Sequence, residues 1–238
     1  MNLKRVLKII GGIVIFLTLP SLLLYCFVYF KYNEDLPVGI KGAQAEALTS
    51  KMLDALDYKA YQNTNYIEWT FKNRHHYKWE KSNHQCMVYW EDYKVHLNFD
   101  DSSKSKAYIH NFEVVGEQAQ ELINKAIAYF NNDSFWLVAP YKVLDAGTER
   151  SLVTLKNGEQ ALLVTYTSGG STPGDSYLWH LDTNGQPTSF QMWVSILPID
   201  GLEATWNDWT VTKSGAILPT FHKFLIFGLE LRDVKGTD

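Results

Sequence analysis

The chain is short of cysteine, the residue on which disulfide cross-linking depends. Only two of its 238 residues are cysteines, and Cys26 lies inside a long apolar run near the N-terminus. Cys26 and Cys86 therefore cannot pair within one folded copy, so the globular part has no internal disulfide and gives no information about its redox compartment. The sequence also lacks a Gly-x-Ser-x-Gly elbow and a P-loop, which removes two common signatures of hydrolases and of nucleotide-binding enzymes.

Charge is missing from residues 9–30, a run of 22 positions without one ionisable acid or base. A helix over this run is roughly 33 Å long at 1.5 Å per residue, enough to cross a hydrocarbon core of about 30 Å. Lys4, Arg5 and Lys8 precede the run and no acid does. The positive-inside rule then predicts a single-pass membrane anchor with a cytoplasmic N-terminus and an extracytoplasmic C-terminal part.

Two other interpretations of the apolar run remain open. Pro20-Ser21 could end the shorter apolar core of a cleaved signal peptide, although no small-residue cleavage site precedes Tyr32. Cys26 could carry a lipid, but a bacterial lipobox has a small residue before its cysteine and Tyr25 stands there. Cleavage would release the domain from the membrane, so it is the one event that would reverse the assignment of an anchor.

The rest of the chain has the length of a single domain. We expect residues 1–31 to form a cytoplasmic tip and the anchor, residues 32–41 a linker, and residues 42–238 one globular domain. Residues 1–30 hold three of the 22 basic residues and no acid, which leaves 19 basic against 26 acidic residues and a net charge of −7 for the rest of the chain. A net-acidic domain argues against nucleic acid and against an anionic membrane surface as its main partner.

The spacing of apolar residues predicts two helices and a series of strands. Helical spacing covers residues 44–56 and residues 117–130, and we expect the second helix to end at Asn131-Asn132-Asp133. Alternation with a period of two predicts strands at residues 66–72, 76–80, 85–90, 93–99, 152–155, 161–167, 177–182, 188–196, 202–210 and 217–227. Strand runs interrupted by helices indicate an α+β domain with a large antiparallel sheet that is covered by one or two helices.

The order of these elements and the segment from Asn131 to Lys142, NNDSFWLVAPYK, resemble the superfamily of bacterial lipoprotein localisation factors. The resemblance implies a strongly curved antiparallel sheet, an incomplete β-barrel, into which the N-terminal helix of the domain packs. It also implies a lid, here residues 117–130, over a hydrophobic cavity that shields acyl chains from water. The carriers of this superfamily latch the lid with an arginine, for which Arg74 and Arg150 are the candidates.

The anchor separates this chain from those carriers, which are soluble and exchange cargo between membranes. A linker of about ten residues reaches about 35 Å even when fully extended. The resemblance therefore implies a lipid-binding or lipid-sensing relative that works close to its own membrane, which would be a bacterial inner membrane with the domain facing the periplasm.

Tryptophan recurs on nearly every predicted strand, and the predicted ligand site rests on it. A bulky aromatic core is the ordinary explanation, because sheets favour aromatic residues. In the other interpretation a subset of these residues lines an apolar cavity in a barrel too open to fill itself. Trp136 and Trp179 are the best candidates, the first for its place in the family-like segment and the second for its crowded apolar strand. The predicted ligand contacts are Trp136, Trp179, Tyr177, Trp193, Trp206 and Phe130.

Two groups of polar residues are further candidate sites. The Gly-rich segment at residues 168–175 could form an anion-binding nest at the cavity rim, with Ser171, Thr172 and Asp175 as polar contacts, but a long hairpin connection is its ordinary explanation. His84, Cys86 and His96 could meet across a hairpin as zinc ligands. The sequence indicates no fourth ligand, so we predict no metal and no cofactor.

We therefore expect a membrane-tethered extracytoplasmic domain that binds a hydrophobic ligand, a lipid or an acyl chain, and is not an enzyme. One alternative is a structural or protein-interaction module of an envelope complex, which predicts a filled core. The other is an enzyme that uses the Gly-rich segment, which predicts polar side chains converging beside it.

Overall fold

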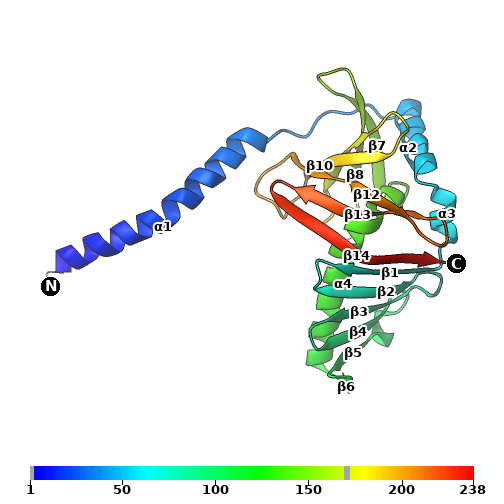
Figure 1. Cartoon of the computed structure of the whole chain (residues 1–238), viewed down its shortest axis with the longest axis horizontal. Helices are drawn as coiled ribbons and strands as arrows, with labels where there is room; N and C mark the ends of the chain where they lie inside the picture. Colours follow the sequence, from blue (N-terminus) through cyan, green and yellow to red (C-terminus); the bar gives the residue numbers. More distant parts are fainter. Residues whose placement is uncertain (1–2, 169–171) are drawn as a thin grey trace.

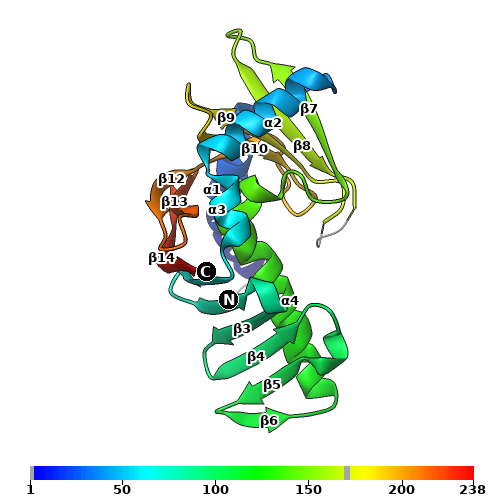
Figure 2. The ribbon, with the colours of Figure 1, turned by 90° about the vertical axis from the view of Figure 1, so that its right-hand side faces the viewer.

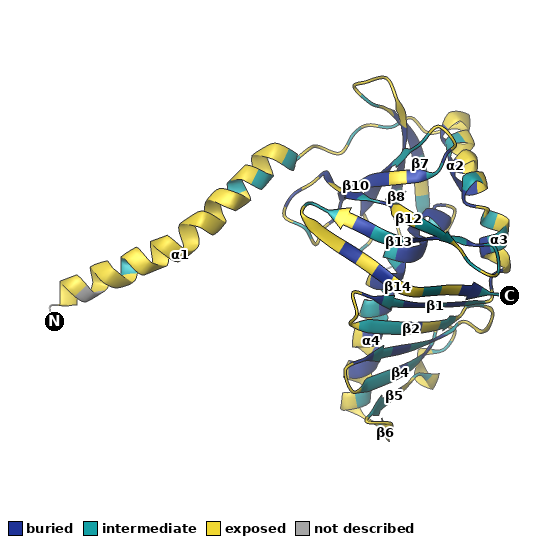
Figure 3. Cartoon of the chain, in the orientation of Figure 1, coloured by how far each residue is buried: buried dark blue, intermediate teal, exposed yellow. Residues whose placement is uncertain are grey.

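The computed structural model describes residues 3–168 and 172–238 (Figure 1). Its first helix, α1 (Leu3–Tyr32), projects from the domain and leaves nearly all of its side chains exposed (Figure 3). The helix is apolar and long enough to span a membrane, and its most apolar window has no buried residue. The expected helix over residues 9–30 is thus confirmed, and it extends beyond that run at both ends.

The domain is built on one strongly curved, open antiparallel sheet. Fourteen strands are found among the described residues: β1 (Tyr66–Phe71), β2 (His75–Glu80), β3 (Gln85–Trp90), β4 (Tyr93–Asn98), β5 (Lys106–Ile109), β6 (Phe112–Val114), β7 (Thr148–Thr154), β8 (Gln160–Tyr166), β9 (Ser176–Leu181), β10 (Pro187–Trp193), β11 (Leu202–Thr205), β12 (Asn207–Val211), β13 (Ile217–Phe224) and β14 (Phe227–Thr237). Their spatial order is β6-β5-β4-β3-β2-β1-β14-β13-β11-β10-β9-β8-β7, with β12 paired to β13 beside this path. The predicted α+β class and the curved antiparallel sheet are confirmed.

The C-terminal strand divides this sheet in two. Strand β14 pairs with β1 on one side and with β13 on the other. We call β1 to β6 the first half-sheet and β7 to β13 the second half-sheet. Neighbours in both half-sheets are also neighbours in sequence, except that β13 pairs with β11 as well as with β12.

Three helices accompany the sheet: α2 (Ala43–Ala55), α3 (Tyr58–Asn63) and α4 (Glu117–Val138). Figure 2 shows α4 running along the concave side of the sheet, from the first half-sheet to the second. It contacts β4 and β5 at one end of its path and β13 at the other, while α2 packs on β7 and β8. Helix α4 therefore bridges the two half-sheets from inside the curve.

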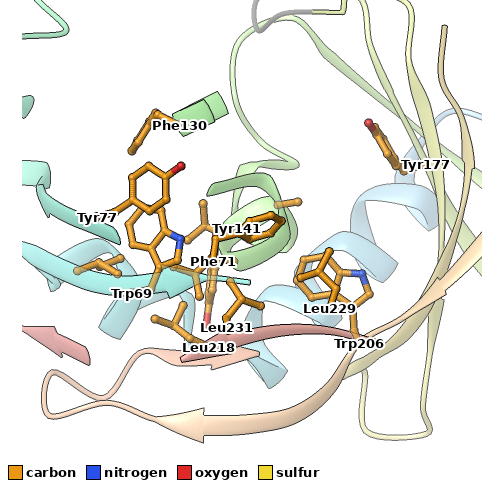
Figure 4. Close-up of a cluster of buried hydrophobic side chains, with 14 of the residues drawn as sticks. Trp69, Phe71, Tyr77, Phe130, Tyr141, Tyr177, Trp206, Leu218, Leu229 and Leu231 are labelled. Atoms are coloured by element: carbon orange, nitrogen blue, oxygen red, sulfur yellow. The ribbon is translucent and has the colours of Figure 1, made fainter. Parts of the chain in front are cut away.

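The space between the sheet and α4 is filled with large side chains (Figure 4). Strands β1 and β3 bury every second residue, as the alternation in their sequences predicts. Trp69, Tyr77 and Leu218 are fully buried, and Phe130 of α4 is nearly so. Each large apolar side chain removed from water contributes about 1.5–3 kcal/mol, so this filling is the main source of the domain's stability.

Several elements differ from the sequence-based expectation. Helix α3 and strands β5, β6 and β14 are present where the spacing predicted none, and the expected strand at residues 202–210 is two strands. The chain bends between β11 and β12 at Trp206, which buries its indole in the core. Strand β14 contains Asp233 at a φ of 56°, and its register to β1 shifts between Glu68 and Thr70. This irregularity interrupts the alternation that would have revealed the strand.

The segment expected as a linker, residues 32–41, lies against the second half-sheet. The Glu34 amide donates to the Asp200 carbonyl at 3.1 Å, and the indole N–H of Trp193 donates to the Glu34 carbonyl at 2.8 Å. Further on, Ile40 and Leu152 exchange two backbone hydrogen bonds of 2.8 and 2.9 Å. Because these contacts hold the linker against the domain, the domain lies much closer to the end of α1 than the full length of an extended linker.

Candidate functional site

The concave face of the second half-sheet carries a continuous group of aromatic side chains. Trp179 of β9 lies 5.0 Å from Trp206 and 5.1 Å from Phe190, measured between ring centroids. The His222 ring of β13 lies 4.5 Å from Trp206. Phe190 and Trp179 pair directly across neighbouring strands and so share a face, whereas Trp206 reaches this group from the bend between β11 and β12.

Helix α4 adds its own aromatic residues to this group. The Trp136 ring lies 5.7 Å from Phe190 and 5.2 Å from His222, and the Phe135 ring lies 4.7 Å from Tyr177. Trp136 is half-buried, whereas the residues it meets on the sheet are buried. The aromatic interior therefore has two walls, one on the strands and one on α4.

Phe130 contacts the other half of the molecule. Its ring packs 5.3 Å from Trp79 and 6.2 Å from Trp69, which itself stacks on Tyr77 at 4.4 Å. Six residues separate Phe130 from Trp136, about 9 Å along a helix. The predicted contact residue Phe130 thus packs against the first half-sheet. It lies away from the other predicted contacts Trp136, Trp179, Tyr177 and Trp206.

The predicted end of the lid helix at Asn131-Asn132-Asp133 is wrong, because α4 continues to Val138. Asp133 is 1% exposed and accepts hydrogen bonds from the Tyr77 hydroxyl at 2.5 Å and from the Asn132 amide at 2.8 Å. The Nδ1 of His75 lies 2.7 Å from the same carboxylate. These tertiary bonds satisfy a side chain that in isolation competes with helix, and they fasten α4 to β2.

The group of Asp133, Tyr77 and His75 is called the Asp133 latch below. Burial, and next the nearby Asp133 carboxylate, raise the pKa of Tyr77, so its hydroxyl stays a hydrogen-bond donor at physiological pH. The sequence contained one indication of this latch. The apolar spacing at residues 126, 130 and 137 continues through the Asn-Asn-Asp segment, which places Asp133 on the buried face of one longer helix.

Neither arginine that the resemblance offered as a lid latch contacts α4 in the described bonds. Arg150 of β7 binds Glu46 of α2 with an Nε–Oε2 distance of 3.0 Å, and its Nη1 donates to the Val143 carbonyl at 3.0 Å. Arg74 is exposed in the turn between β1 and β2. Arg150 therefore holds α2 against the second half-sheet, and the polar fastening of α4 is the Asp133 latch.

Several buried polar atoms in this interior have no hydrogen-bond partner among the described residues. Four belong to the second half-sheet: Trp179 Nε1, Trp206 Nε1, Tyr166 Oη and His222 Nε2; two more, Trp69 Nε1 and Trp90 Nε1, belong to the first. An unmade bond of this kind costs about 1–3 kcal/mol, so each such group calls for an explanation. Of the four atoms in the second half-sheet, the two indole nitrogens and the tyrosine hydroxyl can donate a hydrogen bond, and the histidine nitrogen can accept one.

His222 is the acceptor in this set. Its Nδ1 lies 3.0 Å from the Thr205 carbonyl, which can only accept, so the proton sits on Nδ1 and leaves Nε2 as an acceptor. Burial lowers the pKa of His222 to about 4, against the smaller opposing effects of the Thr205 and Trp136 carbonyls. The imidazole is therefore neutral at physiological pH.

The residues of the aromatic interior are largely buried, and two hollows of the described surface lie away from it. One, of about 410 Å³, is lined by residues of β12, β13 and β14 and includes Asp208 and Arg232. The other, of about 240 Å³, lies between β5, β6 and the start of α4. None of the six predicted ligand contacts lines either hollow, so a ligand could enter the interior only if α4 or its side chains moved.

Trp193 is the one predicted contact that lies on the opposite face of the sheet. It packs with Leu163, Leu178 and Val153 in a separate small cluster and donates its indole N–H to the linker. Successive residues of a strand point to opposite faces, and Trp193 follows the buried Met192 of the concave face. Trp193 therefore does not join the aromatic interior.

The polar residues proposed for the Gly-rich segment serve the fold where the structure describes them. Ser171 lies outside the described residues. The Thr172 hydroxyl hydrogen-bonds to Asp175, whose other carboxylate oxygen accepts from the Ser195 amide at 3.1 Å. Asp175 is buried, and a buried carboxylate at this point opposes the binding of an anion.

The three residues considered for zinc are not brought together. His84 precedes β3 and pairs with Asp100 on the surface at 2.7 Å, and His96 pairs with Gln85 at 2.9 Å. Cys86 faces the core, where burial raises the pKa of its thiol. His84 adopts a φ of 50° just before the strand begins, which removes it from the face that alternation assigned to it.

No protein-family model matches the chain, and no curated protein matches it. Among solved structures, a similar chain is that of a DUF1329 family protein from Desulfovibrio piger, with 6% sequence identity and a TM-score of 0.38. The alignment covers 81% of this chain and 92% of that one. At this identity and TM-score the likeness carries no argument about family or function.

Proposed function

We propose that the protein is anchored in a membrane by α1 and that its domain binds a hydrophobic ligand between α4 and the second half-sheet. The ligand is a lipid or an acyl chain, and the domain performs no covalent chemistry. Lys4, Arg5 and Lys8 at the start of α1 favour a cytoplasmic N-terminus and an extracytoplasmic domain. The family resemblance of the sequence favours a bacterial inner membrane with the domain in the periplasm.

The observation that carries this proposal is the set of unpartnered polar atoms inside an aromatic interior. Trp179 Nε1 and Trp206 Nε1 are donors and His222 Nε2 is an acceptor, all buried against the face that α4 covers. Pairing these groups with the ester or hydroxyl of an amphiphile would recover free energy that the closed state leaves unused. The aromatic walls would at the same time bury its chain, at about 25 cal/mol per Å² of apolar surface.

The side chains of Phe135 and Trp136 must move to admit such a ligand. The Asp133 latch fixes helix α4 to the first half-sheet, whereas Phe135 and Trp136 meet the second half-sheet. Trp136 follows Asp133 by less than one helical turn, so rotation of these two side chains, without displacement of the helix, would separate the two aromatic walls and leave the latch in place. The interior would then open on the side of the second half-sheet.

A second candidate function is a structural or protein-interaction module of an envelope complex. The filled interior favours it, because a module that only contacts other proteins needs no internal space. The two candidates differ in whether the interior ever holds a molecule, which makes the presence of a bound lipid the deciding measurement.

The test is mass spectrometry of lipids extracted from the detergent-solubilised full chain. Any membrane-anchored protein carries some lipid, so the informative comparison is between Trp179→Phe and Trp193→Phe, two buried tryptophans on opposite faces of neighbouring strands. We expect wild type and Trp193→Phe to retain the same acyl species and Trp179→Phe to lose them several-fold. Equal lipid content in all three proteins would contradict a ligand in the interior and favour the interaction module.

A further inference from the structure

A group of exposed apolar residues occupies one end of the second half-sheet. Ile226 is 85% exposed, Ile196 70% and Phe227 65%. Pro198 of the same loop as Ile196 is exposed as well. These four residues are called the apolar tip. Single exposed apolar residues are common on protein surfaces, so it is the grouping of four that needs an explanation.

The strand register brings the two parts of the tip together. Ala204 of β11 pairs with Phe224 of β13, and continuing this antiparallel register by two residues sets Leu202 beside Ile226. Leu202 directly follows the loop at residues 194–201 that carries Ile196 and Pro198. The hairpin between β13 and β14 and the loop between β10 and β11 thus end at the same edge of the domain.

The hairpin at this edge is both strained and apolar. Phe224 pairs with Phe227, so Leu225 and Ile226 form a two-residue turn, and Leu225 has a φ of 54°. Of these two residues only Leu225 has a positive φ, and a two-residue turn with that geometry favours glycine at its first position. A leucine in the left-handed region followed by an exposed isoleucine lowers both stability and solubility, which points to a use for this turn outside the fold.

The tip lies next to the end of α1. The Asp200 amide donates to the Asn33 side chain at 3.0 Å, and the Asp200 carbonyl accepts from the Glu34 amide at 3.1 Å. A Cβ on Gly201 would lie 3.0 Å from the Glu34 Cβ, so the loop and the chain leaving α1 are in close contact. Figure 1 shows both tip segments on the side of the domain from which α1 departs.

We propose that the apolar tip inserts into the outer leaflet of the membrane that α1 crosses. This inference rests on the anchoring in the proposed function. The hydrogen bonds between Asp200 and residues 33 and 34 hold the tip at the level where the anchor leaves the bilayer. Because the domain has a net charge of −7, it has no cationic excess to attract it to anionic lipids. This edge is therefore attached to the membrane by insertion of its apolar side chains. The contact sets the second half-sheet against the lipid from which its ligand would come.

The test uses environment-sensitive dyes on single cysteines of the full chain in phosphatidylcholine vesicles that contain shallow doxyl lipid quenchers. Cys26→Ala provides the background, because Cys86 is buried in the core. Dyes are placed by Phe227→Cys in the tip and by Phe30→Cys at the end of the anchor. Val211→Cys is the matched control, an exposed apolar position paired with Ile217 at the other end of β13.

We expect emission from position 227 to shift to shorter wavelength and to be quenched several-fold more than emission from position 211. Quenching at position 30 with none at position 227 would overturn the tip contact and leave the anchoring intact. An absence of quenching at position 30 would instead overturn the anchoring, and the tip contact with it.

A second variant separates membrane contact from folding. Replacing Leu225 and Ile226 together by Leu225→Gly and Ile226→Asn supplies the glycine that this turn favours at its first position, so we expect the urea midpoint to stay or rise. A dye at Ile196→Cys should then lose several-fold of its lipid quenching in this variant. Unchanged quenching in a folded Gly-Asn variant would contradict the role of the hairpin.

Discussion

The two half-sheets bury similar aromatic side chains but treat polar groups differently. In the first, the buried Asp133 carboxylate has partners in Tyr77, His75 and Asn132. In the second, His222 Nε2 and the Trp179 and Trp206 indoles have none among the described residues. The indole N–H groups of Trp69 and Trp90 in the first half-sheet are unpartnered as well, but the buried carboxylate at its contact with α4 has hydrogen-bond partners.

This difference separates a scaffold from a region that can change. Bonds that satisfy a buried carboxylate are lost only at high cost, so the contact of α4 with the first half-sheet is fixed. Aromatic packing is less directional, and the Phe135 and Trp136 side chains can rotate without leaving a charge unpaired. The contacts of α4 with the two half-sheets should therefore differ in the free energy that is lost when they are broken.

The largest effect is expected from breaking the Asp133 latch. Asp133→Ala removes the acceptor of Tyr77 and His75 and should lower the free energy of unfolding by about 3 kcal/mol. Urea denaturation of the detergent-solubilised full chain measures it. Asp145→Ala is the matched control, because its exposed ion pair with Lys142 should contribute less than about 0.5 kcal/mol. Similar losses in the two variants would mean that the latch does not hold α4.

A pH-dependent effect is expected in the second half-sheet. Burial lowers the pKa of His222 to about 4 from the ordinary 6.5, so below pH 6.5 the unfolded chain binds a proton that the folded chain does not. Stability from this group is full above pH 6.5 and falls as the pH drops toward 4, by about 2 kcal/mol between pH 7 and pH 5.

His222→Gln should remove this dependence while it keeps a side-chain donor for the Thr205 carbonyl. The urea midpoints at pH 7 and pH 5 should then lie closer together than in wild type. His110→Gln, at an exposed site beside Asp92, should leave the wild-type difference unchanged. An unchanged difference in His222→Gln would show that His222 is not buried as a neutral ring.

A smaller effect is expected from the arginine that the resemblance offered as a lid latch. Arg150→Ala loses a partly exposed pair with Glu46 and a bond to the Val143 carbonyl, which should cost about 1 kcal/mol. Because Arg150 holds α2, the amount of bound lipid should not change. Arg74→Ala, in an exposed turn, should leave both stability and lipid content as they are. A change of lipid content in Arg150→Ala would contradict the assignment of the fastening to Asp133.

The sequence predicted strands β1 to β4 most accurately, because they alternate without interruption. Strand β3 has the predicted bounds, residues 85–90, and β1, β2 and β4 differ from prediction by one residue at one end. The C-terminal strand β14 was missed because charges and an irregular pairing with β1 hide its period. Short elements such as α3 and β6 contain too few residues for a period to be recognised.

The candidate site was predicted in part. Alternation placed Tyr177 and Trp179 on one face of their strand, and the structure brings them together with Trp136 and Trp206. The prediction of Trp193 as a ligand contact is wrong, because its position in β10 points its side chain to the opposite face of the sheet. The Asp133 latch was missed because Asn-Asn-Asp ordinarily ends a helix, and only the distant Tyr77 and His75 make its continuation favourable.

The location of a bound acyl chain tests the central claim most directly. The full chain is equilibrated in detergent with a fatty acid that carries a photoreactive diazirine at the end of its chain, then irradiated, digested and analysed by mass spectrometry. We predict adducts on peptides of the second half-sheet and on the turn of α4 that holds Phe135 and Trp136. Adducts confined to α1, with none on these peptides, would contradict a ligand between α4 and the second half-sheet.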